Sequence, residues 1–169
     1  MLSKEAKNYI KQNQYLLEEN KFQKFFDKCD WAFKNEIAEF FLLDCDINFL
    51  EYMTEISSYL FYNSKRLESI NIPDSVTKIC KSAFSSCILL QSITISNSVT
   101  KIDDYAFYWC TSLQSVTIPD SVIEIGKDAF AYCASLKEIK LPKHLKENGL
   151  KLSDIGIQPR KVGTKVIWY

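Results

Sequence analysis

Residues 90–110 read LQSITISNSVTKIDDYAFYWC, and residues 113–133 read LQSVTIPDSVIEIGKDAFAYC. The same pattern occurs once earlier, at 67–87, and its first half occurs once later, at 136–145 (LKEIKLPKHL). The four copies begin at leucines that are 23 residues apart, namely Leu67, Leu90, Leu113 and Leu136. A fixed period in this range is typical of a solenoid, in which each unit buries its apolar face only by stacking on its neighbours.

Within each copy the apolar residues have a constant spacing. An Ile-x-Ile pair alternates as a strand with one buried face requires, and a Val-x-x-Ile step predicts a second short extended segment. An Ala-Phe-x-x-Cys step follows, and its helical spacing predicts either a single helical turn or a tight bend. Proline comes directly after the first strand in three copies, where it can end the ladder, at Pro73, Pro119 and Pro142. The last columns are Ala83, Ala106 and Ala129; Phe84, Phe107 and Phe130; and Cys87, Cys110 and Cys133.

The period extends upstream in a less regular form. Counting back one unit, residues 47–49, 53–56 and 60–61 fall under the apolar columns, so the solenoid is predicted to start near Asp46. The fourth copy loses its Ala-Phe-x-x-Cys half to 147–149, as expected of a terminal unit. We therefore predict a helical N-terminal cap at 1–45, repeats with degenerate first and last units at 46–149, and a C-terminal cap at 150–169.

The repeated residues resemble the BspA-type leucine-rich repeat family, whose unit runs close to L-x-x-I-x-I-P-x-x-V-x-x-I-x-x-x-A-F-x-x-C. The match covers roughly residues 47–145. The resemblance implies an α/β solenoid: a short right-handed leucine-rich-repeat solenoid of 23-residue units with an N-terminal helical cap and a C-terminal β cap. It also implies protein–protein contact, often on bacterial surfaces or in host-directed proteins. Small members with a helical leader look like proteins carried by phages and mobile elements of low-GC bacteria.

Residues 3–45 lack the 23-residue period and read as three helices. Ser3 can cap a first helix through about Glu19, Asn20 with Gln23 resembles a capping box for a second, and Asp30 can start a third. The apolar side chains of these helices would cover the open N-terminal face of the solenoid; they include Phe22, Phe25, Phe26, Phe33, Ile37, Phe40 and Phe41. The alternative is that part of the leader, around Trp31, docks into a groove of a partner.

Signals of catalysis, metal binding and cofactor binding are weak. His144 is the only histidine, lies between lysines and is expected at the surface, and the Asp103-Asp104 pair occupies variable slots that are expected to be solvated. Phosphate-loop, zinc-helix and C-x-x-C patterns do not occur, so we predict a protein that is not an enzyme and has no cofactor and no metal site. The stacked cysteines read as small packing residues, although a disulfide between adjacent rungs is compatible with a spacing of about 4.8 Å.

Net charge is zero, but residues 140–169 hold seven Lys and Arg against two acidic residues, a balance of 7 − 2 = +5. This end is either a solvated cap or a basic tip for an acidic protein face or a nucleic-acid backbone. The final segment 166–169 (VIWY) predicts a closing strand whose edge could support a homodimer. A run of about 18 apolar residues and an apolar signal segment are both absent from the sequence, so a cytoplasmic address is expected, in the host cell if the protein is phage-encoded.

Aromatic residues occupy outward slots of the Ala-Phe-x-x-Cys step, where Ser85, Ser86 and Ala131 stand in other copies. The candidate protein-binding residues are Tyr105, Tyr108, Trp109 and Tyr132, with Tyr62 in an equivalent slot. They form either a binding patch or a cluster that packs on itself across rungs. Two functional hypotheses follow: a phage-encoded inhibitor that binds and blocks a bacterial host assembly such as a defence (CRISPR-type) nuclease, or a cell-surface or secreted adhesion module.

Overall fold

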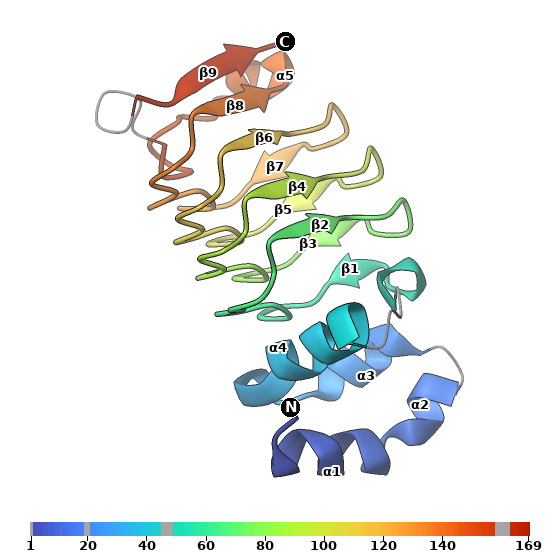
Figure 1. Cartoon of the computed structure of the whole chain (residues 1–169). Helices are drawn as coiled ribbons and strands as arrows, with labels where there is room; N and C mark the ends of the chain where they lie inside the picture. Colours follow the sequence, from blue (N-terminus) through green and yellow to red (C-terminus); the bar gives the residue numbers. More distant parts are fainter. Residues whose placement is uncertain (1, 19–20, 45–48, 158–162) are drawn as a thin grey trace.

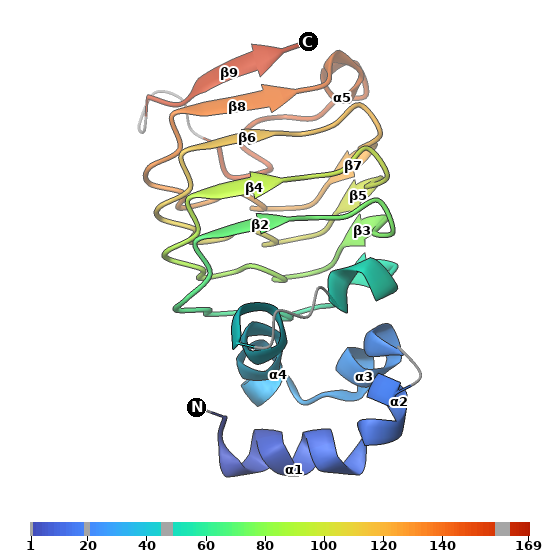
Figure 2. The ribbon, with the colours of Figure 1, turned by 45° about the vertical axis from the view of Figure 1, so that its right-hand side comes forward.

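The computed structural model describes residues 2–18, 21–44, 49–157 and 163–169; the side chains of 18 and 31–33 lie outside the description. Helices form one end of the molecule, and a stack of parallel strands rises from them to the C-terminus at the opposite end (Figure 1). The strands form two sheets, which we name sheet A and sheet B, on two sides of the stack (Figure 2). The predicted solenoid of parallel strands is confirmed.

Each turn of the solenoid contributes one short strand to each sheet. Sheet A consists of β1 (Glu55–Ile56), β3 (Lys78–Ile79), β5 (Lys101–Ile102) and β7 (Glu124–Ile125). Sheet B consists of β2 (Ser69–Asn71), β4 (Ser92–Thr94), β6 (Ser115–Thr117), β8 (Glu138–Leu141) and β9 (Lys165–Trp168). Neighbouring repeat strands pair in parallel with a register of 23 residues, for example Ile70 with Ile93 and Ile79 with Ile102.

The constant register places like residues above like residues in the core. Rings of the Phe column are nearly parallel, with centroid distances of 5.3, 5.3 and 5.2 Å along Phe61, Phe84, Phe107 and Phe130. Backbone hydrogen bonds continue between rungs outside the strands, because Phe84 N–H donates to Ala106 O and Phe107 N–H donates to Ala129 O, both at 2.8 Å. The Phe column therefore packs where the backbone of successive turns is also hydrogen-bonded.

The Ala-Phe-x-x-Cys step forms a tight bend, which settles the choice left open by its spacing. Two residues of each bend have a positive φ, and these residues are Tyr59, Asn63, Ser82, Ser86, Tyr105, Trp109, Asp128 and Tyr132. Left-handed backbone reverses the chain direction within a few residues, at a cost for residues other than Gly. The bend therefore returns the chain from sheet A to sheet B without a helix.

The cysteines of the repeat occupy a buried column, as predicted for packing residues. All three thiols are free, and each donates to the carbonyl oxygen of a Phe in the preceding turn; these bonds are Cys87 to Phe61 (3.0 Å), Cys110 to Phe84 (3.2 Å) and Cys133 to Phe107 (3.2 Å). Burial raises the pKa of the Cys87 and Cys133 thiols to about 12 and that of Cys110 well above its usual range. The thiols thus act as weak donors between turns, and their environment disfavours the reactive thiolate.

The N-terminal residues form more helices than predicted. The observed elements are α1 (Lys4–Gln12), α2 (Gln14–Glu18), α3 (Phe22–Lys28), α4 (Trp31–Glu39), a π-helical turn η1 (Phe40–Asp44) and a 3-10 turn η2 (Phe49–Tyr52). Ser3 caps α1 as predicted, but the first helix is interrupted at Asn13. The predicted capping box is wrong, because Lys21 is the N-cap of α3 and Gln23 contacts the solenoid; Asn20 lies outside the described residues.

Aromatic side chains of the helices cover the first turn of the solenoid, as predicted. Phe26 and Phe41 pack around Phe49, which in turn lies 6.5 Å from Phe61 at the start of the Phe column. The phenyl rings of Phe25, Phe26 and Phe49 are fully buried. The aromatic core of the cap is therefore continuous with the core of the repeats. The predicted role of Trp31 concerns a side chain outside the description.

Three polar side chains of the cap bind the first turn of the solenoid. Gln23 Oε1 accepts hydrogen bonds from the N–H groups of Thr54 (3.2 Å) and Glu55 (3.0 Å), at the outer edge of β1. Lys34 Nζ donates to Ser58 O (3.2 Å), and Glu39 Oε1 accepts from the hydroxyl of Ser64 and the N–H of Arg66. Lys34 and Glu39 are both buried, and burial lowers the pKa of the Lys34 amine. The helical cap thus forms hydrogen bonds with backbone groups of the first turn that, in later turns, are bonded to the preceding turn.

The first and last turns depart from the predicted unit. Ile56, Leu60 and Phe61 are fully buried where the repeat requires it, but Phe49 begins a 3-10 turn and is not part of a strand; Asp46 lies outside the described residues. At the other end, α5 (Lys143–Glu147) follows β8, and the predicted closing strand is present as β9, paired in parallel with β8. The division at 1–45, 46–149 and 150–169 stays a prediction.

Replacing Gln23 with Met should destabilise the protein by about 1–3 kcal/mol, because two N–H groups at the edge of β1 lose their acceptor. Urea unfolding followed by circular dichroism measures this change. The control is Gln12→Met, at an exposed position of α1, which should change stability by less than about 0.5 kcal/mol. Equal effects of the two substitutions would contradict the proposed edge contact.

Candidate functional site

The four predicted binding residues lie together on the bend between sheet A and sheet B. Tyr105 packs edge-on against Tyr108 (5.5 Å between centroids), Tyr108 packs edge-on against Tyr132 (5.2 Å), and Trp109 lies 5.8 Å from Tyr132. Trp109 and Tyr132 are 47% and 63% exposed, whereas Tyr105 and Tyr108 are half-buried. We name Tyr105, Tyr108, Trp109 and Tyr132 the aromatic edge. The two alternatives therefore coexist: the rings pack on one another, and the outer two remain open to solvent.

The backbone of the aromatic edge is in a conformation that aromatic residues rarely adopt. The φ angles of Tyr105, Trp109 and Tyr132 are 58°, 60° and 60°. Asn63 and Ser86 occupy the slot of Trp109 and Tyr132 in earlier turns. A bulky residue in left-handed backbone costs about 1–2 kcal/mol, and such strain is concentrated at functional sites. The bend therefore does not need aromatic residues at these positions.

An apolar pocket of about 280 Å³ opens between the two exposed rings and the C-terminal segment. Trp109 and Tyr132 form one side, and Gly156, Ile157 and Thr164 form the other. Gly156 has φ +83° and lies so close to Ala131 that a Cβ atom would be 2.5 Å from the Ala131 Cβ. The backbone at Gly156 therefore packs directly on Ala131, and the pocket lies beside this contact, next to Tyr132. The pocket has room for a bulky apolar side chain of a partner.

The pocket was not predictable from the repeat, because one wall comes from residues outside it. Tyr59 was also missed; it packs against Tyr62 (5.8 Å) in the first turn, and counting forward two units of 23 residues would have aligned it with Tyr105. The serines of the second turn separate this tyrosine pair from the aromatic edge. The described aromatic residues of the bends thus form two clusters, of which the second adjoins the pocket.

A family comparison accounts for the repeat. The model of the BspA type leucine rich repeat region matches residues 54–152 in six copies, which is more than half of the chain. The chain belongs to the BspA-type leucine-rich repeat family. The family and this fold are typical of protein–protein interaction modules without catalytic activity. No curated protein sequence matches the chain.

Two solved leucine-rich repeat structures support the assignment. The pneumococcal vaccine antigen PcpA is 29% identical, with a TM-score of 0.52, over 53% of this chain and 22% of its own. A leucine-rich repeat protein of T. pallidum, TpLRR, is 28% identical, with a TM-score of 0.53, over 69% of this chain and 45% of its own. The chain thus spans less than half the length of either protein. Both comparisons relate the fold of this chain to that of the two solved proteins.

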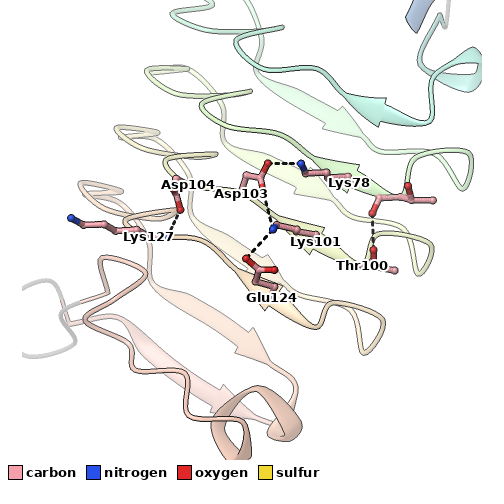
Figure 3. Close-up of polar contacts among 8 residues, drawn as sticks. Lys78, Thr100, Lys101, Asp103, Asp104, Glu124 and Lys127 are labelled. Atoms are coloured by element: carbon pink, nitrogen blue, oxygen red, sulfur yellow. Dashed lines mark hydrogen bonds and ion pairs between the residues drawn. The ribbon is translucent and has the colours of Figure 1, made fainter.

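The acidic pair of this BspA-type repeat has a structural role that was not predicted. Asp103 bridges two turns by ion pairs with Lys78 (2.8 Å) and Lys101 (3.5 Å), and Lys101 continues to Glu124 at 2.9 Å (Figure 3). Asp104 Oδ1 accepts from the N–H of Lys127 at 2.7 Å. Asp104 is exposed and Asp103 is half-buried, so the pair reaches solvent as expected, but both carboxylates also bind groups of adjacent turns.

His144 is partly exposed, as expected of a surface residue, and it also makes a structural contact. It is half-buried on α5, and its Nε2 donates to Val122 O at 2.8 Å, so it joins the last turn to the solenoid. Among the residues that the structure describes, no group of three His, Cys, Asp or Glu side chains could hold a metal ion. None of the described helices has the length and apolar character to cross a bilayer.

Three lysines of the basic C-terminal end contact groups of the same chain. Lys140 and Lys165 both lie 3.7 Å from Glu138, and Lys146 Nζ lies 5.9 Å from the centre of the Trp168 ring. Arg160 and Lys161 lie outside the described residues. The solvated cap and the basic tip for an acidic protein face or a nucleic-acid backbone both stay predictions.

The Trp109→Asn variant should be as stable as the parent protein or up to about 1 kcal/mol more stable, because Asn tolerates left-handed backbone and already occupies this slot at Asn63. Thermal and urea unfolding measure the change. The comparison variant is Phe107→Ala in the buried column of the same turn, which should lose about 3–5 kcal/mol. A loss above about 2 kcal/mol for Trp109→Asn would show that the ring supports the fold.

Proposed function

We propose that this chain is a protein–protein interaction module without catalytic activity, and that its aromatic edge is the binding surface. The observation that carries the proposal is the exposure of Trp109 and Tyr132 in left-handed backbone beside an apolar pocket. Trp and Tyr are enriched among the few interface residues that dominate binding energy, and such residues surround or fill well-packed pockets. The half-buried Tyr108 packs against Tyr105 and Tyr132, and Tyr132 in turn packs against Trp109.

The energetic argument favours binding over self-packing. Each strained residue costs about 1–2 kcal/mol, whereas a pair of aromatic rings gains only about 0.5–1.5 kcal/mol beyond the area that it buries. Trp109 has one ring contact among the described residues, with Tyr132, and still exposes nearly half of its surface. A partner that buries the exposed part of Trp109 would gain hydrophobic free energy that the contact with Tyr132 alone does not provide.

The first setting that we propose is inside a bacterial cell, where a phage-encoded inhibitor would bind and block a host assembly such as a defence (CRISPR-type) nuclease. A small binding module without recognised catalytic motifs suits this role, because steric blocking requires affinity and no chemistry.

The second setting is the bacterial surface or the secreted fraction, where the module would take part in adhesion. Similarity to a pneumococcal vaccine antigen supports this alternative. Fractionation of the native host, with detection of this chain by mass spectrometry, distinguishes the two settings. Recovery in the washed cell envelope or the medium would contradict the cytoplasmic proposal, and recovery only in the cytosol would contradict the adhesion proposal.

Partner capture should depend on the aromatic edge. We expect the double variant Trp109→Asn, Tyr132→Asn to lose about 100-fold or more in affinity for a partner isolated with the parent protein, because two dominant contacts of about 2 kcal/mol each are removed. Biolayer interferometry with the purified partner measures the affinity.

The matched control is Ile123→Thr. Ile123 is 69% exposed in the slot that Thr54, Thr77 and Thr100 occupy in the other turns, so this variant removes an equally exposed apolar side chain at a different surface. Its affinity should stay within about twofold of the parent value. Equal losses in both variants, or capture unchanged by the double variant, would contradict the aromatic edge as the binding surface.

We also propose that β9 supports a homodimer. β9 is the last strand of sheet B, and the N–H groups of Lys165 and Tyr169 donate toward β8, so those of Val166 and Trp168 face the other edge. Val166 and Trp168 remain half-buried, whereas Ile139 and Leu141 beside them on β8 are fully buried. An antiparallel β9 of a second copy would pair this edge and cover these side chains.

Light scattering coupled to size-exclusion chromatography should give the mass of a dimer. Val166→Pro should give a monomer, because proline removes an outward N–H and obstructs strand pairing at that edge while the hydrogen bonds to β8 remain. Far-UV circular dichroism checks that the variant retains the fold. A monomeric parent protein, or a dimer that persists in a folded Val166→Pro variant, would contradict the β9 interface.

A further inference from the structure

A second hollow on the described surface lies away from the aromatic edge. It has a volume of about 630 Å³ and lies over β4 and β6 of sheet B, where the exposed strand faces meet the loops that follow them. The hollow beside Trp109 is less than half as large, at about 280 Å³. Residues of two successive turns and the last residue of the chain line the larger hollow, so it is formed by the stacked solenoid and by no single unit.

Tyr169 forms a fixed aromatic wall of this hollow. Its N–H donates to Leu141 O (3.1 Å) at the end of β8, and its hydroxyl donates to Ile118 O just beyond β6. The residue is tethered at both ends and is still 42% exposed. Burial of the hydroxyl raises its pKa, so it stays a neutral donor. A ring held in this way offers a flat face that needs no ordering when a ligand binds.

Hydroxyl groups form the floor of the hollow. Ser92 and Ser115 are paired across β4 and β6, with Thr94 and Thr117 two residues further along, and all four are exposed. Strand geometry spaces these side chains by about 4.8 Å between strands and about 6.6 Å along a strand. Each hydroxyl can both donate and accept a hydrogen bond. The floor is therefore a grid of neutral hydroxyls that can either donate hydrogen bonds to ligand hydroxyls or accept hydrogen bonds from them.

The rim of the hollow carries one amide and one carboxylate and no positively charged side chain. Asn97 and Asp120 come from the loops after β4 and β6, and they supply an amide and a carboxylate. The lining contains no Lys, Arg or His. An anionic ligand such as a phosphate or a sulfated chain would meet one carboxylate and no cation, which disfavours it. A lipid would leave the hydroxyl grid without hydrogen bonds.

We propose that this hollow binds a neutral saccharide, with a pyranose ring against Tyr169 and its hydroxyls on the Ser/Thr grid and Asp120. A pyranose has C–H faces and a rim of hydroxyls that donate and accept, and the hollow combines an aromatic wall with a polar floor of the same mixed character. The site is on sheet B and uses none of the residues of the aromatic edge, so it is independent of the function proposed above.

The test is a titration of the ¹⁵N-labelled full chain with methyl glucoside, methyl galactoside, methyl mannoside, N-acetylglucosamine and their β-linked or α-linked disaccharides. At least one sugar should bind with a Kd on the order of 1 mM, since an open hollow leaves part of the ligand solvated. Thr117→Val should weaken binding about fivefold and Asp120→Ala about tenfold or more, because each removes hydrogen bonds to the sugar.

Two controls separate this site from the rest of the surface. Ser69→Ala removes a hydroxyl on the same face of sheet B outside the hollow, and Trp109→Asn alters the aromatic edge; both should bind within about twofold of the parent protein. Absence of binding by every sugar, or binding that Thr117→Val leaves unchanged, would overturn the proposal. A sulfated disaccharide and an extended peptide are titrated in the same way, and tighter binding of either one in the hollow would also overturn the proposal.

Discussion

Hydrogen bonding between successive turns is the constraint on which the rest of the structure depends. The bonds occur in the strands and continue through the bends, where Phe84 donates to Ala106 and Phe107 to Ala129. Because each turn must present its backbone to the next in the same register, side chains one period apart are forced into contact. Residues that tolerate a copy of themselves as neighbour are therefore required in each column: stacked rings at Phe, and thiols that donate to a carbonyl of the preceding turn at Cys.

The same constraint leaves unsatisfied backbone at both ends, and the two ends are treated differently. At the first turn, Gln23, Lys34 and Glu39 supply acceptors and donors from the helices, which cover the core with aromatic rings at the same time. At the last turn, residues near 154–155 accept from Asp128 and Phe130, and β9 extends sheet B by one more strand. The helices therefore cover the first edge of the stack, whereas β9 adds a strand to sheet B and leaves its own outer edge with unpaired backbone groups.

The periodicity of the sequence predicted the features that the strand register controls. It did not predict contacts between residues that are far apart in the sequence and outside the repeat. The columns and the two strands per unit followed from spacing alone, since identical neighbours are a consequence of the period, whereas the closing strand followed from the apolar segment 166–169. The bend at Ala-Phe-x-x-Cys was ambiguous, because Ser86 and Tyr132 carry no sign of the left-handed backbone that Asn63 would suggest. Gln23 could not be assigned to the edge of β1, nor His144 to Val122, because both bonds join residues more than 20 positions apart without a period between them. The candidate residues themselves were predictable, but the pocket beside them was not, since Ile157 and Thr164 lie outside the repeat.

Separation of fold and recognition is the physical advantage of this arrangement. The columns bury residues whose loss is costly, so their identity is restricted, whereas a bend slot accepts Asn, Ser, Trp or Tyr on the same backbone. A substitution in that slot can add or remove an aromatic ring at the surface. It changes the free energy of unfolding by little more than the cost of placing that residue in left-handed backbone. Because adjacent turns bring their slots within ring contact, two substitutions one period apart are enough to build a continuous patch, as Trp109 and Tyr132 show. The outer face of sheet B varies by the same rule but with small polar groups, so one repeat can carry two surfaces of opposite chemistry without a change in its core.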